Sequence, residues 1–250
     1  MSSNKNILEY WEDEKVESMY DKHLLNAEIS MIKKEINFNS KILDAGCGEG
    51  EGTLAYSLVK GVNIEAVDFS KTRLQKASER LKGNINIQLK HIDFLGNYNL
   101  AKDYDIIISQ RFLINLTNWS QHKKVILDLL SLLKPEGKLI MLEGSKQGVD
   151  SLNEFRLVWG MEPINIKWHN FFFDDKKLSD FLYLNKYKLI NHDGFGSYFL
   201  LTRGIRPLLE KDLNWDNRFN FLASIQKTRE MIGIDETKFS RVKFWVFQKI

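Results

Sequence analysis

The chain has 250 residues and a mass of 29.3 kDa, which suits one large domain, or an ordinary domain with an appended helical cap. Its hydrophobic fraction of 43% and charged fraction of 28% are typical of a soluble globular protein, and they exclude wholesale disorder and collagen-like sequence. The single cysteine excludes an intramolecular disulfide and a four-cysteine zinc site, and it favours a reducing, cytoplasmic compartment.

The N-terminal sequence and the charge pattern argue against export, membrane insertion and nucleic-acid binding. The first residues are polar and lead into acids at Glu9 and Glu12, where a secretion signal would be basic and then apolar. No apolar run approaches the roughly 20 residues that span a bilayer. The net charge is only +3, and the lysines of the chain are scattered among acids, whereas a nucleic-acid binder usually concentrates positive charge on one face. The abundance of Lys, Asn and Ile is typical of a bacterial chain, and we expect neither a membrane nor a nucleic-acid partner.

Short apolar runs and segments of helical spacing alternate along the first part of the chain. Residues 7–36 have helical composition. A further helix is predicted at 71–81, with Ser70 as its N-cap. The alternation predicts a doubly wound, mostly parallel α/β sheet with ligands at the carboxyl ends of its strands. The predicted strands are 41–45, 64–67, 85–89, 104–109 and 138–142, and the helices between them are 53–60, 71–81 and 120–133.

The C-terminal part of the chain completes a predicted sheet of seven strands. Strands are expected at 188–192 and 241–247, and this last pair is expected to run antiparallel to, or reversed against, the parallel set. Further helices are expected at 151–159, 175–185 and within 198–232. We predict a single domain made of an N-terminal helical cap at 1–40, a core at 41–196, a helical cap insertion at 197–236 and a final strand within 237–250.

The most informative segment, residues 44–50, has the sequence DAGCGEG and follows the first predicted strand. Glycines at alternating positions let the main chain turn sharply and approach a ligand closely. A dinucleotide loop would need Gly at position 51, which is Glu51, and a phosphate loop would need a following Lys, which is absent. The acids of this loop would repel phosphates, so a cationic nucleoside without phosphate fits better. Cys47 is expected to be a small loop residue beside that ligand.

The loop resembles the first motif of the class I S-adenosylmethionine-dependent methyltransferases. In that family an acid and then Gly at alternating positions follow the first strand, and Asp44, Gly46, Gly48 and Gly50 match this pattern without a departure. The resemblance covers about residues 41–143. It implies a Rossmann-like methyltransferase fold and S-adenosylmethionine as the cofactor, whose sulfonium and ammonium groups are cations.

The resemblance also implies an acid after each of the next two strands. Asp68 follows Asp44 by 68 − 44 = 24 residues, about one βαβ unit, and is expected to hold the ribose hydroxyls. Asp93 is expected to accept a hydrogen bond from the adenine amino group, with Phe69 and Phe94 on either side of the ring.

Two further groups are expected at the methionine end of the cofactor. Gln110 and Arg111 follow the fourth strand and would border it. Tyr10, Trp11 and Tyr20 in the N-terminal helical segment would fold over the sulfonium, because a cation favours an aromatic face.

The end of the fourth strand points to a small polar acceptor and a reaction without a metal. It lacks the Asn/Asp-Pro-Pro-aromatic sequence of enzymes that methylate base amines, and it lacks the acid with which catechol-type enzymes hold a metal. A hydroxyl acceptor needs a base, whereas an amine only needs to be neutral. His169, in an aromatic loop, and Glu143, after the fifth strand, are the candidate bases, and they favour methylation at oxygen.

Arginines in the C-terminal half are candidates for binding the acceptor. Arg203 and Arg206 lie near Tyr198 in the predicted cap, and Arg156 precedes it. Guanidinium groups bind carboxylates and phosphates bidentately, which predicts an acceptor with an anionic handle, such as a sugar nucleotide or another phosphorylated metabolite. Three alternatives stay open: a small-molecule N-methyltransferase, an RNA methyltransferase with a basic groove, and a non-catalytic module that binds the cofactor.

Overall fold

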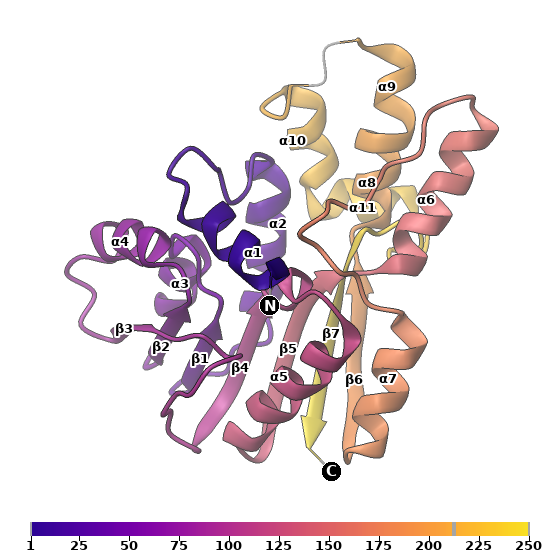
Figure 1. Cartoon of the computed structure of the whole chain (residues 1–250). Helices are drawn as coiled ribbons and strands as arrows, with labels where there is room; N and C mark the ends of the chain where they lie inside the picture. The colour runs from indigo at the N-terminus through magenta and orange to yellow at the C-terminus, as the bar shows by residue number, and fades with distance from the viewer. Residues whose placement is uncertain (1, 212–213, 250) are drawn as a thin grey trace.

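A seven-stranded sheet forms the centre of the computed structural model, which describes residues 2–211 and 214–249 (Figure 1). The strand order is β3-β2-β1-β4-β5-β7-β6. β7 is antiparallel to both of its neighbours, and the other paired strands are parallel. The strands are β1 Lys41–Ala45, β2 Asn63–Asp68, β3 Ile87–His91, β4 Tyr104–Gln110, β5 Leu133–Gly144, β6 Tyr187–Gly194 and β7 Val242–Lys249.

The predicted fold class is confirmed, with one correction to the direction of the last strands. Because β6 and β5 are both antiparallel to β7, β6 runs in the same direction as β5, and β7 is the reversed strand. Residues 1, 212–213 and 250, which fall within the predicted caps and final strand, lie outside the described residues. Within the described ranges, none of the helices combines the length and apolarity needed to cross a membrane.

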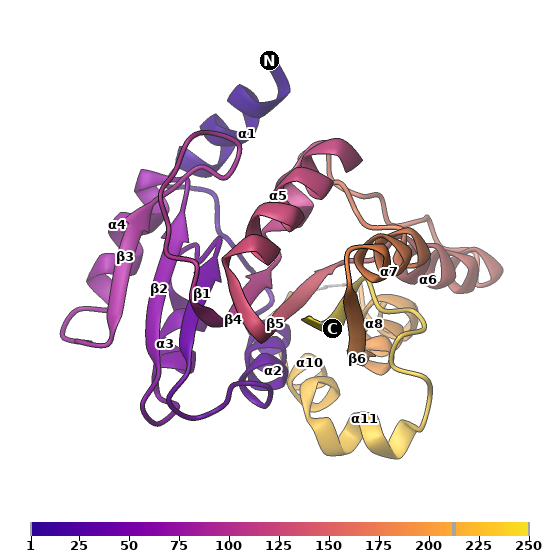
Figure 2. The ribbon, with the colours of Figure 1, turned by 90° about the horizontal axis from the view of Figure 1, so that it is seen from below.

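Helices form a layer on each face of the sheet (Figure 2). α5 and α7 cover one face, and α2, α3, α8, α10 and α11 lie on the other. A short 3₁₀ helix, η1, follows β4, and a π-helical turn, η2, joins α8 to α9. The helices are α1 Ser2–Glu12, α2 Lys22–Lys33, α3 Glu51–Ser57, α4 Lys71–Arg80, η1 Leu113–Asn115, α5 Trp119–Leu132, α6 Lys146–Val158, α7 Asp175–Leu184, α8 Gly196–Phe199, η2 Leu200–Ile205, α9 Arg206–Leu209, α10 Arg218–Ser224 and α11 Gln226–Ile232.

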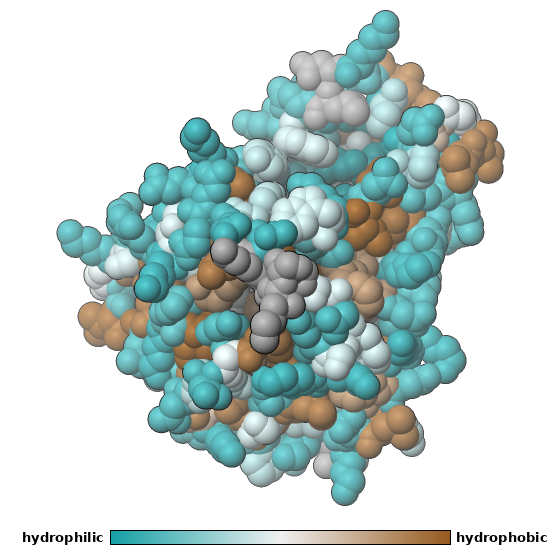
Figure 3. All heavy atoms as spheres, in the orientation of Figure 1, coloured by the Kyte–Doolittle hydropathy of each residue, from teal (hydrophilic) through white to brown (hydrophobic). Residues whose placement is uncertain are grey.

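The central strands are buried on both faces, which explains their continuous apolar sequences. In β4, Ile107 belongs to the core beneath α5 and α7, whereas Ile106 and Ile108 belong to the core beneath α2. Leu139 and Ile140 of β5 divide between the two cores in the same way. The outer surface is mixed: on the face shown in Figure 3, hydrophilic residues predominate and hydrophobic residues form scattered patches.

Several element boundaries differ from the predicted ones for local reasons. β3 begins two residues later than expected, and Ile85 is fully exposed rather than part of the strand. α6 begins at Lys146 rather than 151, because the Ser145 side chain accepts a hydrogen bond from the Gly148 N–H at 3.0 Å and caps the helix. The predicted cap at Ser70 is confirmed, since its side chain accepts from the Arg73 N–H at the start of α4.

The N-terminal helical segment is divided in two, and its parts lie beyond the carboxyl ends of the parallel strands. Asp21 caps α2 by accepting from the Leu24 N–H at 3.2 Å, so the chain leaves helical geometry between α1 and α2. Figure 1 shows α1, α2, α8, α9 and α10 at this edge of the sheet. The division of the chain into a core and two caps remains a prediction.

The start of α6 packs unusually closely on the residues that precede β7. A Cβ atom placed on Gly148 would lie 1.7 Å from the carbonyl oxygen of Ser240, a main-chain atom that cannot rotate away. We therefore expect Gly148→Ala to lower the free energy of unfolding by about 3 kcal/mol or more, measured by urea denaturation. Gly96→Ala is the control, because its nearest contact would be an ordinary 3.5 Å. Equal stabilities of the two variants would contradict this packing.

Candidate cofactor and acceptor site

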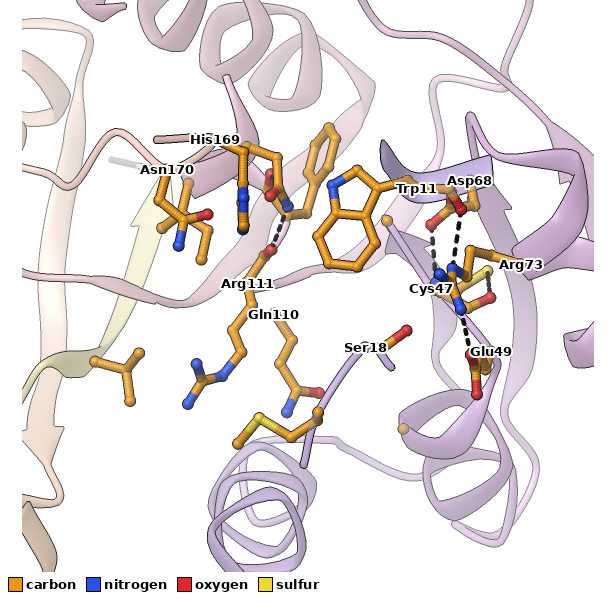
Figure 4. A pocket seen from close by; sticks show the side chains of 18 of the residues that line it. Trp11, Ser18, Cys47, Glu49, Asp68, Arg73, Gln110, Arg111, His169 and Asn170 are labelled. Carbon is orange, nitrogen blue, oxygen red and sulfur yellow. Dashed lines mark hydrogen bonds and ion pairs between the residues drawn. The ribbon is translucent and has the colours of Figure 1, made fainter. Parts of the chain in front are cut away.

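A cavity of about 610 Å³ opens at the carboxyl ends of the parallel strands. This volume lies within the range of about 300–1,000 Å³ that is usual for small-molecule sites. Its walls come from the loops after β1, β2, β3 and β4, from α1 and the loop that follows it, from the segment near His169, and from η2 (Figure 4).

The glycine loop after β1 forms one wall of the cavity with bare main chain. Gly46, Gly48 and Gly50 have positive φ angles of 74°, 55° and 78°. A Cβ atom on Gly46 would lie 2.5 Å from Cβ of Phe112, so glycine is required there for a steric reason as well. Gly46, Cys47 and Gly48 line the cavity, whereas Gly50 lies behind it and precedes α3.

The three predicted acids line this cavity together, as do Phe69 and Phe94. Each carboxylate is oriented by a hydrogen bond from the protein. Asp44 accepts from the Thr53 hydroxyl at 2.6 Å, and Asp93 accepts from the Leu95 N–H at 2.8 Å. Asp68 accepts from the N–H groups of Gly48 at 2.8 Å and Ser70 at 2.9 Å, which also fixes the glycine loop.

Two of these acids are buried next to each other. Burial raises the pKa of Asp44 to about 6, and the nearby negative charge of Asp68 adds to the shift. Burial also raises the pKa of Asp68, although the hydrogen bonds from Ser70 and Gly48 oppose the shift. A raised pKa means that the protein does not fully stabilise the negative charge, so a bound cation would be favoured here.

The helix α1 is fixed against α4 by a hydrogen-bonded contact that the sequence did not suggest. Arg73, only 2% exposed, donates from Nε to the Trp11 carbonyl at 3.1 Å and from Nη1 to Glu49 at 2.6 Å. Ser70 donates its hydroxyl to the same Trp11 carbonyl at 3.1 Å. Glu12 accepts from the N–H of Lys71 at the first turn of α4. These contacts hold the aromatic residues of α1 at the mouth of the cavity.

Aromatic rings from α1 and from the segment near residue 169 meet at that mouth. The ring of Tyr10 stacks on His169 with centroids 4.4 Å apart, and Trp11 meets the same imidazole edge-on at 5.8 Å. His169 is 6% exposed and its Nδ1 has no partner among the described residues. Burial lowers the pKa of His169 to about 4, so the imidazole is neutral at pH 7. Tyr20 also lines the cavity but remains largely exposed.

Gln110 and Arg111 line the cavity from the end of β4 and are held by a buried acid on α2. Glu28 is fully buried; it accepts from Gln110 Nε2 at 3.0 Å and forms a two-point ion pair with Arg111. Tyr56 donates its hydroxyl to Gln110 Oε1 at 2.8 Å. Sequence reasoning missed Glu28 because an isolated acid on a helix is usually a surface residue.

The structure does not bring Glu143, one of the two candidate bases, to the cavity wall. Its fully buried carboxylate accepts hydrogen bonds from the Ser109 hydroxyl at 2.5 Å and from the N–H groups of residues 112–114 at 2.9–3.1 Å. Burial raises the pKa of Glu143 to about 7 even though these hydrogen bonds oppose the shift. This geometry does not fit the expected base role: Glu143 holds the turn after β4 and is buried outside the cavity wall.

Of the predicted acceptor-binding residues, Arg203 lines the cavity, whereas Arg156, Tyr198 and Arg206 lie outside its wall. Arg203 pairs with Asp21 at 2.7 Å. Arg156 donates to the main-chain carbonyl of Arg203, and Tyr198 donates its hydroxyl to Asp21 at 2.8 Å. Arg206 is buried and donates to the Glu210 carboxylate at 2.7 Å and to Asn220 Oδ1 of α10 at 3.1 Å. These three residues support Arg203 or the surrounding helices rather than reaching into the cavity.

Comparisons with known proteins agree with this geometry. The methyltransferase domain family matches residues 42–137. Phosphoethanolamine N-methyltransferase from Plasmodium falciparum is 28% identical over 109 residues, which cover 44% of this chain and 41% of that protein. Demethylmenaquinone methyltransferase from Clavibacter sepedonicus is 30% identical over 105 residues, or 42% of this chain and 41% of that protein. The matched segments thus span about two fifths of the length of each of these curated relatives.

A solved structure extends the similarity in fold to the whole chain. The N-methyltransferase NodS from Bradyrhizobium japonicum, in complex with S-adenosyl-L-homocysteine, superposes with a TM-score of 0.58 at 12% identity and covers 100% of this chain and 99% of its own. Residues 42–137 thus match the methyltransferase domain family, and the whole chain shares its fold with a solved methyltransferase. S-adenosylmethionine is the cofactor of this family.

The residues that line the cavity fit that cofactor. The left-handed main chain at Gly46 leaves room that a side chain would fill. The raised pKa of Asp44 and Asp68 favours a ligand that carries positive charge and no phosphate. When bound, the cofactor supplies an activated methyl group on a sulfonium, and the protein supplies its position and the exclusion of water.

The pKa of Asp44 predicts that cofactor affinity depends on pH. Because this pKa is raised from 3.8 to about 6, the carboxylate is mostly ionised above that pH and protonated below it. A cation binds the ionised form, so the dissociation constant of S-adenosylmethionine is expected to rise as the pH falls below 6, by at most about tenfold per unit. Calorimetric titrations across this range should show a flatter profile for Asp44→Asn. An unchanged pH profile in that variant would contradict the role of this carboxylate.

Proposed function

We propose that this protein transfers a methyl group from S-adenosylmethionine to a polar small molecule. The observation that supports it most is the convergence of Asp44, Asp68 and Asp93 on one cavity beside the glycine loop. In this proposal Asp68 holds the ribose hydroxyls, and Asp93 accepts from the adenine amino group. The ring lies between Phe69 and Phe94.

The methionine end of the cofactor would extend along the glycine loop toward Gln110 and Arg111. Both side chains are held by Glu28, so little conformational freedom is lost when they meet a ligand. Tyr10 and Trp11 would close over the sulfonium from α1, and the contacts between α1 and α4 support that position. The acceptor would then occupy the part of the cavity beyond Arg111, next to His169 and Arg203.

The acceptor atom is proposed to be oxygen, with His169 as the group that takes its proton. The imidazole is neutral at pH 7 and its Nδ1 is free of protein partners in the described structure, both of which a base requires. Nitrogen is the second candidate. The low pKa of His169 favours nitrogen, because a neutral amine can attack without a base whereas a hydroxyl needs one, and this imidazole is a weak base. The similarity to a phosphoethanolamine N-methyltransferase also favours nitrogen.

Removal of the proposed ribose ligand tests the cofactor site. Asp68→Asn keeps the size of the side chain but removes the charge, so we expect the dissociation constant of S-adenosyl-L-homocysteine to rise about 10- to 100-fold, measured by calorimetry. Asp180→Asn is the matched control, because Asp180 is 59% exposed on α7 and lies outside the cavity wall. No binding by the wild-type protein, or equal binding by Asp68→Asn, would reject the proposed function.

A substitution at His169 separates the two acceptor atoms. His169→Phe keeps a ring that can stack on Tyr10 but removes the base. For an oxygen acceptor we expect kcat to fall at least about 100-fold with little change in cofactor affinity. The readout is transfer of a labelled methyl group to the acceptor. Retention of wild-type kcat would instead place the methyl group on nitrogen.

A further inference from the structure

Charge is divided between two sides of the cavity wall. The acids Asp44, Asp68 and Asp93 belong to β1, β2 and the loop after β3, which lie next to one another in the sheet. Arg111 and Arg241 belong to the end of β4 and the residue just before β7, on the other side of the strand order. Figure 4 shows this separation for the labelled residues: Asp68 lies at the glycine loop, away from Arg111 and His169.

The arginines on the second side differ in how their charge is balanced. Arg111 pairs with Glu28, and Arg203 pairs with Asp21. Arg241 has no hydrogen-bond acceptor or acid for its side chain within residues 2–211 and 214–249, and its Nε is buried without a partner. Its guanidinium carbon lies over the Phe172 ring, 6.0 Å from the centroid. Arg241 is therefore a partly buried cation that the described residues leave uncompensated, which is costly unless a ligand completes it.

A second open donor lies on Arg203. Its Nη2 is used by Asp21 and its plane covers the Trp215 ring at 3.9 Å, but Nη1 is buried without a partner. Arg111, Arg203 and Arg241 line the same cavity. Burial lowers the pKa of Arg241 to about 10, and the positive charges of Arg111 and Arg203 add to the shift. An anion between Arg203 and Arg241 would remove that repulsion and satisfy both open donors.

The main chain holds Arg241 firmly in this unfavourable position. Its carbonyl accepts from the Ser145 N–H at 2.9 Å, at the end of β5. The preceding residue, Ser240, packs against Gly148 with no room for a side chain. The backbone at Arg241 is thus fixed by β5 and by α6, so its side chain starts from a fixed position beside the cavity.

We propose that Arg241 and Arg203 form a binding subsite for a phosphate monoester carried by the methyl acceptor. A phosphate monoester has about −1.5 to −2 charges at pH 7 and three oxygens, which match two guanidinium groups better than a single carboxylate does. Lys167, exposed at the same wall, adds positive charge at the entrance. The assignment of the phosphate to the acceptor rests on the proposed function, whereas anion binding by these two arginines does not.

The test measures inorganic phosphate binding by calorimetry, with and without saturating S-adenosyl-L-homocysteine, and uses acetate as the carboxylate arm. We expect the wild-type protein to bind phosphate more tightly than acetate. Arg241→Gln should weaken phosphate binding about 10- to 100-fold. Lys188→Gln is the control, because it removes the same charge from an exposed residue of β6 outside the cavity. Arg241→Lys keeps the charge without the guanidinium fork and should weaken binding less than Arg241→Gln.

Stability without ligand gives a second readout that separates a binding role from a structural one. Removal of an uncompensated buried cation should leave Arg241→Gln at least as stable as the wild type, and phosphate should no longer raise its Tm. Loss of stability in this variant, wild-type phosphate affinity in it, or tighter acetate than phosphate binding by the wild type would each overturn the subsite. Phosphate binding without S-adenosyl-L-homocysteine binding would instead reject the proposed function and leave the subsite standing.

Discussion

The site depends on buried carboxylates at the carboxyl ends of β1 and β2 whose charge the protein does not fully balance. Asp44 and Asp68 are almost fully buried, and burial raises the pKa of both. The donors that orient them are a hydroxyl and main-chain N–H groups rather than a fixed cation. Neutral donors fix the orientation of the carboxylates but do not neutralise their negative charge, so a cationic ligand can do so. The glycine loop serves the same end, because bare main chain lets that ligand approach closely.

Elsewhere in the molecule, ion pairs between a buried group and its partner fix the flanking helices. Arg73 ties α1 to the glycine loop through Glu49, and Glu28 ties α2 to the end of β4 through Arg111. Both pairs join segments that are distant in sequence, and Arg73, Glu49 and Arg111 line the cavity. Breaking such a pair leaves a buried charge alone, so each pair holds its helix in one position. Ion pairs therefore fix the walls of the cavity, whereas Asp44 and Asp68 are oriented by neutral donors.

What the sequence could predict follows from how local each signal is. The strands β1, β2, β4 and β5 and their alternation with helices were predictable because strands buried on both faces have continuous apolar sequences. The glycine loop and Asp68 could be predicted because the motif and its spacing are local in the sequence. The roles of Arg241 and Glu28 could not be predicted, because they depend on contacts between segments that are far apart in the sequence. Glu143 shows that a position in the sequence does not determine the direction of a side chain. Its place at the end of a strand was predicted correctly, but the direction of its side chain was not.

The strand order gives these observations a common explanation. Strands β1 to β3 carry the acids on one side of the point where the chain reverses direction in the sheet, and β4 and β7 carry arginines on the other. A cationic cofactor and an anionic acceptor would each be attracted to its own half and repelled by the other. Such a division orients both molecules before any close contact forms. The cost is the self-repulsion of Arg241 with Arg203 and Arg111, which the empty protein bears and which an anionic ligand would relieve.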